Sequence, residues 1–102
     1  MATPILPDAD RESPFSAEDR VMHTTKYAER SFGASIGDIG TVEAAGNSAV
    51  LVVTVEGTAY KLRWARQPNG QILWFVDGDD RPLVPGPSSR GLAQLRHQLA
   101  QR

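Results

Sequence analysis

The chain has 102 residues, of which 40% are hydrophobic and 23% charged, and its formal net charge is -1. This length suits one domain with a modest core, and no apolar stretch approaches the ~20 residues of a membrane-spanning helix, so we expect no membrane partner. The absence of cysteine excludes disulfides and thiolate ligands and favours a reducing, cytoplasmic location.

The N-terminal end of the chain predicts an arm followed by a helix. Residues 1–14 contain three prolines and three acids, which is typical of a disordered or loosely attached segment. Residues 15–102 are expected to form a single α+β domain. Ser16 is suited to cap a helix over residues 17–31, and Gly33 is suited to end it.

The middle of the chain predicts a four-stranded antiparallel β-meander. Residues 33–40 are glycine-rich and are expected to be a flexible connector. Strands are expected over residues 41–44, 49–55, 58–65 and 71–77. The intervening turns are Gly46-Asn47, Glu56-Gly57 and Pro68-Asn69-Gly70, whose residue types favour tight hairpins.

The C-terminal end predicts a second helix that packs on the sheet. A loop precedes a helical pattern over residues 89–101, in which Leu92, Leu95 and Leu99 form one apolar stripe. The order of a helix followed by a meander resembles cystatin-like domains in architecture only. Fold does not determine function, so this resemblance implies no activity.

The turns fix the strand register, and the register predicts which side chains share a face. One face should form the core, with Trp64 opposite Trp74 and Leu62 opposite Val76. The leucine stripe of the last helix is the expected cover. The rest of this face is apolar as well: Val42, Ala44, Ala49, Leu51, Val53, Tyr60 and Ile72.

The opposite face of the sheet, called the second face below, is predicted to be mixed. It carries an apolar cluster of Val50, Val52, Leu73 and Phe75. We expect Arg63 to lie beside Phe75 in a cation–π contact and Lys61 to pair with Asp77. This face is too apolar to remain bare, so its cover is the first helix, a second copy of the chain or another protein.

The sequence favours a protein-interaction module, either a homodimer or an adaptor. The predicted interface residues are Val50, Val52, Arg63, Leu73 and Phe75, and Phe75 is the expected anchor. The alternative is a nucleic-acid-binding protein, because basic and aromatic side chains on a sheet can hold phosphates and stack bases. Its predicted contacts are Lys61, Arg63, Arg66, Arg90 and Arg96.

No catalytic, metal or cofactor site is predicted. His23 lies one helical turn from Asp19 and from Tyr27, but no nucleophile is paired with it. The acids Asp77, Asp79 and Asp80 lack the closing glutamate of a calcium loop and are expected to form a turn. The chain is therefore more typical of a binding protein than of an enzyme.

Overall fold

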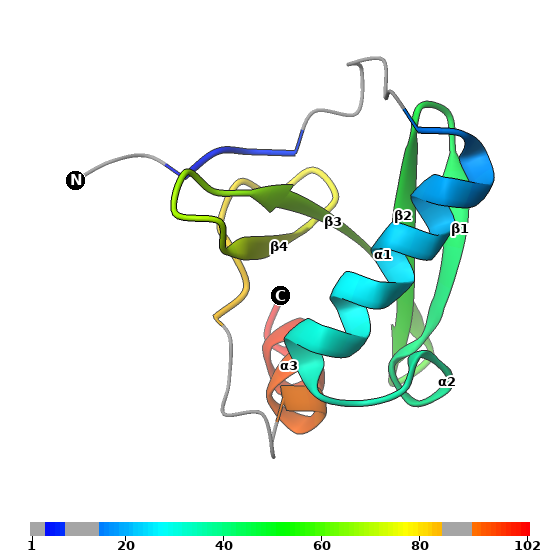
Figure 1. The fold of residues 1–102 in the computed structure, drawn as a ribbon. Helices are drawn as coiled ribbons and strands as arrows, with labels where there is room; N and C mark the ends of the chain where they lie inside the picture. Colours follow the sequence, from blue (N-terminus) through cyan, green and yellow to red (C-terminus); the bar gives the residue numbers. More distant parts are fainter. Residues whose placement is uncertain (1–3, 8–14, 85–90) are drawn as a thin grey trace.

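The computed structural model describes residues 4–7, 15–84 and 91–102 (Figure 1). Its elements, in chain order, are α1 (Ala17–Phe32), α2 (Ile36–Ile39), β1 (Thr41–Ala45), β2 (Ser48–Val55), β3 (Thr58–Arg66), β4 (Ile72–Val76) and α3 (Gly91–Ala100). The predicted α+β fold is confirmed: an N-terminal helix, a four-stranded antiparallel meander and a C-terminal helix. Most of the predicted arm, and the predicted start of the last helix at residue 89, lie outside the described residues.

The ends of α1 follow the local chemistry of the sequence. The Ser16 hydroxyl accepts a hydrogen bond from the Asp19 amide at 3.2 Å, which satisfies one free N–H of the first turn. Gly33 adopts a left-handed conformation with φ of 67°, and its amide donates to the Glu29 carbonyl. The helix therefore ends at Phe32, one residue later than predicted.

The segment after α1 differs from the predicted flexible connector. It contains the short helix α2, and the Ser35 hydroxyl bonds to Asp38 at 2.7 Å within it. Ile39 is 2% exposed and belongs to the core, so burial of this side chain supports the turn of helix. Gly40 then passes against β2, where an added Cβ would lie 2.1 Å from the Val52 carbonyl oxygen.

The sheet has the strand order β1-β2-β3-β4, and its register agrees with the prediction. Trp64 pairs with Trp74, and Leu62 pairs with both Leu51 and Val76. Glycine or glutamate takes positive φ at each tight turn: Gly46, Glu56, Gly57 and Gly70. Turn chemistry alone was therefore sufficient to fix the sheet faces.

Both long helices cover the same face of the sheet. The indole nitrogen of Trp64 donates to the Thr24 hydroxyl at 3.0 Å, and that of Trp74 donates to the Ser31 hydroxyl at 2.9 Å. From α3, Leu95 and Leu99 enter the same core. The core cluster comprises Ala28, Phe32, Ile39, Leu51, Val53, Leu62, Trp74, Leu83, Leu95 and Leu99.

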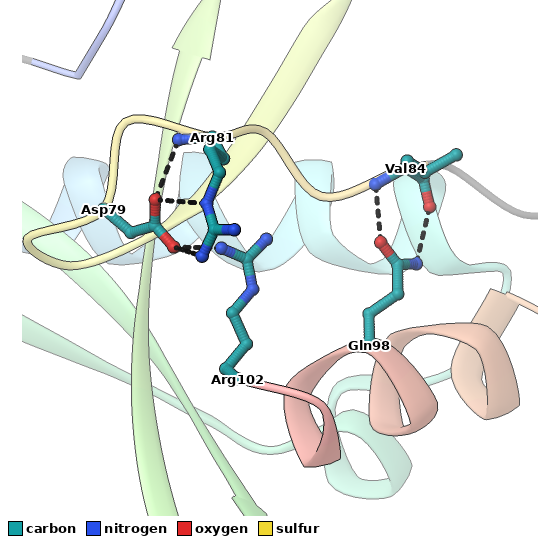
Figure 2. A network of polar contacts seen from close by, with 5 residues as sticks. All are labelled: Asp79, Arg81, Val84, Gln98 and Arg102. Carbon is teal, nitrogen blue, oxygen red and sulfur yellow. Dashed lines mark hydrogen bonds and ion pairs between the residues drawn. The ribbon is translucent and has the colours of Figure 1, made fainter.

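The loop between β4 and α3 is attached at two points, to α3 through Gln98 and to the residue Arg102 that follows α3 (Figure 2). Gln98 accepts a hydrogen bond from the Val84 amide and donates to the Val84 carbonyl, both at 2.7 Å. Asp79 accepts from Arg81 and forms an ion pair with Arg102. The hydrogen bond from Arg81 is the main reason that the pKa of Asp79 falls from 3.8 to about 2.

Candidate binding groove

The predicted interface residues of the second face lie at different depths. Val50 and Phe75 are 1% and 0% exposed, so the chain itself buries them. Val52, Arg63 and Leu73 are half-buried. A partner on this face would therefore contact the half-buried residues before Phe75. The role of Phe75 as the anchor of an interface stays a prediction, and the burial of its side chain does not favour it.

Two predicted side-chain contacts on the second face are wrong. Arg63 donates to Asp77 at 2.8 Å and to the Ser48 hydroxyl, and no described cation–π contact joins it to Phe75. Asp77 is thus the partner of Arg63 and not of Lys61. The guanidinium of Arg63 bonds to the Asp77 carboxylate and to the Ser48 hydroxyl at the same time. Charge-assisted hydrogen bonds of this kind are stronger than a contact with an aromatic ring.

The N-terminal segment, residues 4–7, lies at the edge of the second face. The Gln67 side chain accepts from the Ile5 amide and donates to the Ile5 carbonyl, each at 2.9 Å. Leu6 and Pro7 line a shallow cavity of about 270 Å³ together with Arg63. Neither α1 nor α3 covers this face, so the expectation that the first helix might do so is not met.

The predicted nucleic-acid contacts do not form one surface. Lys61 and Arg63 share the second face, whereas Arg66 lies on the opposite side, where it donates to the Tyr27 hydroxyl. Arg96 donates from α3 to the Asp38 carbonyl at 2.8 Å. Arg90 lies outside the described residues. Because side chains alternate between the two faces along a strand, Lys61 and Arg63 lie on one face of the sheet and Arg66 on the other. Residues that are close in sequence are therefore on opposite sides of the sheet.

A concavity lies between α1 and β4, and we call it the α1–β4 groove. It has a volume of about 460 Å³, within the range of ligand pockets. Its described lining comes from α1, from the β3–β4 hairpin, from β4 and from the loop before α3: Lys26, Tyr27, Arg30, Ser31, Phe32, Arg66, Gly70, Gln71, Ile72, Leu73, Trp74, Leu83 and Val84.

The charged residues of the groove are all basic. Lys26, Arg30 and Arg66 line it, and its described lining includes no acid. Lys26 and Arg30 are one helical turn apart on α1 and are exposed. No salt bridge joins either of them to a carboxylate within the described part of the chain.

An aromatic cluster forms one side of the groove. The guanidinium of Arg66 lies 5.6 Å from the centre of the Tyr27 ring and donates to its hydroxyl. Tyr27 contacts Trp64 edge-on at 4.9 Å between ring centres, and Trp74 contacts Phe32 at 5.5 Å. The packed rings form a rigid side of the groove. The contacts with Tyr27 hold the guanidinium of Arg66 against it, on the groove side of the sheet.

The opposite rim of the groove depends on the loop attachments of Figure 2. Leu83 is buried, and its amide donates to the Trp74 carbonyl at 2.8 Å. Val84 is 69% exposed at the rim, while Gln98 holds its backbone. The loop therefore continues the surface of β4 and presents an aliphatic side chain at the edge of the cavity.

The sequence contains one local signal for this groove. Lys26 and Arg30 have the spacing that places two side chains on one helix face. Arg66, however, comes from a distant strand, and Val84 comes from a loop. Their convergence depends on how α1 crosses the sheet, which periodicity does not specify.

The described residues contain no group of three or more histidine, cysteine or acidic side chains that could hold a metal ion. His23 contacts the rings of Phe15 and Tyr27 at 4.7 and 6.3 Å between ring centres. Within the same part of the chain, no helix is long and apolar enough to cross a membrane. Comparison of the chain with protein-family models, curated proteins and solved structures found no match.

Proposed function

We propose that the protein is a small non-enzymatic interaction module that binds an extended segment of a partner protein in the α1–β4 groove. The observation that carries this proposal is the groove itself, a cavity of about 460 Å³ between a helix and the outer edge of a strand. Apolar, aromatic and basic side chains share its lining. That mixture suits a peptide, whose side chains and backbone offer all three kinds of contact.

The edge of β4 adds backbone groups to the groove. The hydrogen bond from the Gln67 amide to the Gln71 carbonyl fixes the alternation of the β3–β4 ladder. The backbone groups of Ile72 and Trp74 therefore point outward, away from β3. The Leu83 amide already donates to Trp74 on this side, and no described residue bonds to Ile72 there. An extended peptide could continue this pairing, as in strand addition.

The chemistry of the lining supports binding rather than catalysis. Its described residues include no carboxylate and no imidazole, the usual general acids and bases. Two hydroxyls of α1 line it: that of Ser31 accepts a hydrogen bond from the Trp74 indole, and that of Tyr27 accepts one from Arg66. A hydroxyl without an adjacent base is a weak nucleophile.

A peptide-display selection tests the proposal. Random linear peptides displayed on phage are selected against the pure protein, and the affinity of the enriched peptides is measured by fluorescence polarisation. Val84→Asn, which removes the aliphatic side chain at the rim without adding charge, should weaken binding about five- to tenfold. Met22→Asn is the matched control, because Met22 is 65% exposed on α1 and does not line the groove.

Two results would contradict the proposal: a selection with no enriched peptide, or enriched peptides that bind the two variants equally. Light scattering on the pure protein then identifies the case in which the partner is a second copy. A doubled mass that Val84→Asn reduces and Met22→Asn leaves unchanged would assign the groove to self-association.

A further inference from the structure

We infer that the α1–β4 groove recognises an oxyanion, a phosphate or carboxylate group, through Lys26, Arg30 and Arg66. This inference rests on the proposed function, because it names the chemical group that the bound segment must carry. It shares Arg66 with the predicted nucleic-acid contacts but leaves out Lys61 and Arg63, which lie on the second face.

No described carboxylate forms an ion pair with the basic residues of the groove. Lys26 and Arg30 stand one helical turn apart, where two like charges destabilise a helix by roughly 0.2–0.5 kcal/mol. Arg66 faces the same helix, since its guanidinium reaches Tyr27, which lies between them in sequence. An anion bound among the three would relieve this repulsion, and binding to the folded state alone would then stabilise the protein.

The other described arginines form ion pairs or donate to backbone carbonyls. Arg63 and Arg81 donate to Asp77 and Asp79, and Arg102 pairs with Asp79. Arg96 donates to a backbone carbonyl. The three groove cations, by comparison, have no described ion pair, although acids are as numerous as bases in the chain. The groove thus brings together three cations that have no described ion pair.

Arg66 is preorganised by its contacts with Tyr27. Stacking on Tyr27 and the hydrogen bond to its hydroxyl fix the plane of the guanidinium. Only one of its terminal nitrogens is used by that bond, and further N–H groups remain for a ligand. A fixed guanidinium suits the planar, two-oxygen edge of a carboxylate or phosphate.

Among the three groove cations, Lys26 is the one whose substitution tests the effect of charge on binding apart from effects on the fold. Arg30 lies in the last turn of α1, where a cation also interacts favourably with the helix dipole. Arg66 supports Tyr27 and the aromatic wall. Lys26 has neither of these roles, and it is exposed, so Lys26→Glu should leave the fold intact. Lys61→Glu makes the same change on an exposed residue of the second face and is the matched control.

The experiment measures binding of four small probes by amide and indole NMR shifts. Inorganic phosphate, phenyl phosphate and benzoate carry an oxyanion, and benzyl alcohol is the neutral control. The oxyanions should shift signals of α1 residues 26–31, of Arg66 and of the Trp74 indole, and benzyl alcohol should not. The ratio of phenyl phosphate to benzoate affinity distinguishes a phosphate source from a carboxylate source.

Charge reversal should weaken oxyanion binding about tenfold in Lys26→Glu and little in Lys61→Glu. Raising the ionic strength from about 0.05 M to about 0.5 M should weaken it further, because these cations are exposed. Equal binding of benzyl alcohol and benzoate would overturn the inference. So would equal losses in the two glutamate variants, which would indicate a general effect of net charge.

The outcomes separate this inference from the proposed function. Enriched peptides that bind Lys26→Glu as tightly as the parent would overturn the oxyanion inference and leave the peptide groove in place. Oxyanion binding at the groove without any enriched peptide would overturn the proposed peptide groove and leave the oxyanion inference in place. In that case the groove would be a site for a small anionic molecule.

Discussion

The side chain of Phe75 points away from both helices and is nevertheless 0% exposed. Strand alternation puts it on the second face, beside Val50 and Ala65, which are also buried but lie outside the main core cluster. The sheet therefore buries apolar side chains on both faces. At the scale of the residue, Phe75 is therefore packed in the interior of the protein, on the second face of the sheet.

Phe75→Ala should lower the free energy of unfolding by about 3–5 kcal/mol, because it removes a buried ring and leaves a cavity. The measurement is urea denaturation followed by tryptophan fluorescence. Phe15→Ala is the comparison, since Phe15 is 46% exposed, and it should cost about 1 kcal/mol or less. A parental urea midpoint for Phe75→Ala would show that the ring is not packed in solution.

Asp79 should titrate at low pH in the folded protein, near its pKa of about 2. Its folded pKa is lower than the ordinary value of 3.8, so its contribution to stability is present above about pH 4 and is lost as the pH falls towards 2. Arg81→Ala should raise the pKa towards 3.8, because the hydrogen bond from Arg81 is the main cause of the shift. Carboxyl ¹³C shifts measured against pH check this.

Arg96→Ala is the control for Asp79, because Arg96 bonds to the Asp38 carbonyl in another part of the structure. It should leave the titration of Asp79 unchanged. If Asp79 of the parent protein titrated near 3.8, the contacts with Arg81 and Arg102 would not persist in solution.

At the scale of the element, the close contact between α1 and α3 depends on one residue without a side chain. Gly91 begins α3, and an added Cβ would lie 2.3 Å from the Phe32 carbonyl oxygen and 2.8 Å from its carbon. These are backbone atoms at the end of α1, so they cannot move aside as a flexible side chain would. The glycine allows the first turn of α3 to meet the last turn of α1 directly.

Gly91→Ala should therefore destabilise the protein, even though alanine favours a helix by up to about 1 kcal/mol over glycine. Gly37→Ala in α2 is the opposite case, because no atom lies within 4 Å of an added Cβ there. It should be neutral or stabilising. Thermal melting of both variants checks the difference in sign. A Gly91→Ala protein at least as stable as the parent would mean that the two helices are further apart than described.

At the scale of the whole molecule, the sequence predicted what depends on neighbouring residues and missed what depends on distant ones. Pro68-Asn69-Gly70 and the other turns determine the register of adjacent strands, so both sheet faces followed from them. The groove needs Lys26, Arg66 and Val84 to converge from α1, β3 and a loop. No local pattern encodes that convergence.

The same reason explains the errors on the second face. The cross-strand rows correctly put Arg63, Lys61 and Asp77 close together, but several pairings were open to these side chains. The guanidinium of Arg63 reaches both Asp77 and Ser48, and this choice depends on reach and geometry rather than on position in a row. Burial of Phe75 likewise depends on how tightly the chain closes around it.

Gln67 and Gln98 each attach a segment of the chain by a similar pair of hydrogen bonds. The side-chain amide of Gln67 accepts from and donates to the backbone of Ile5, and that of Gln98 does so with Val84. Each amide thus imitates a peptide unit of a neighbouring strand. Ile5 and Val84, held in this way, are 48% and 69% exposed. Both glutamines bond to main-chain atoms only. Substitutions of the side chains at positions 5 and 84 should therefore leave both pairs of hydrogen bonds in place.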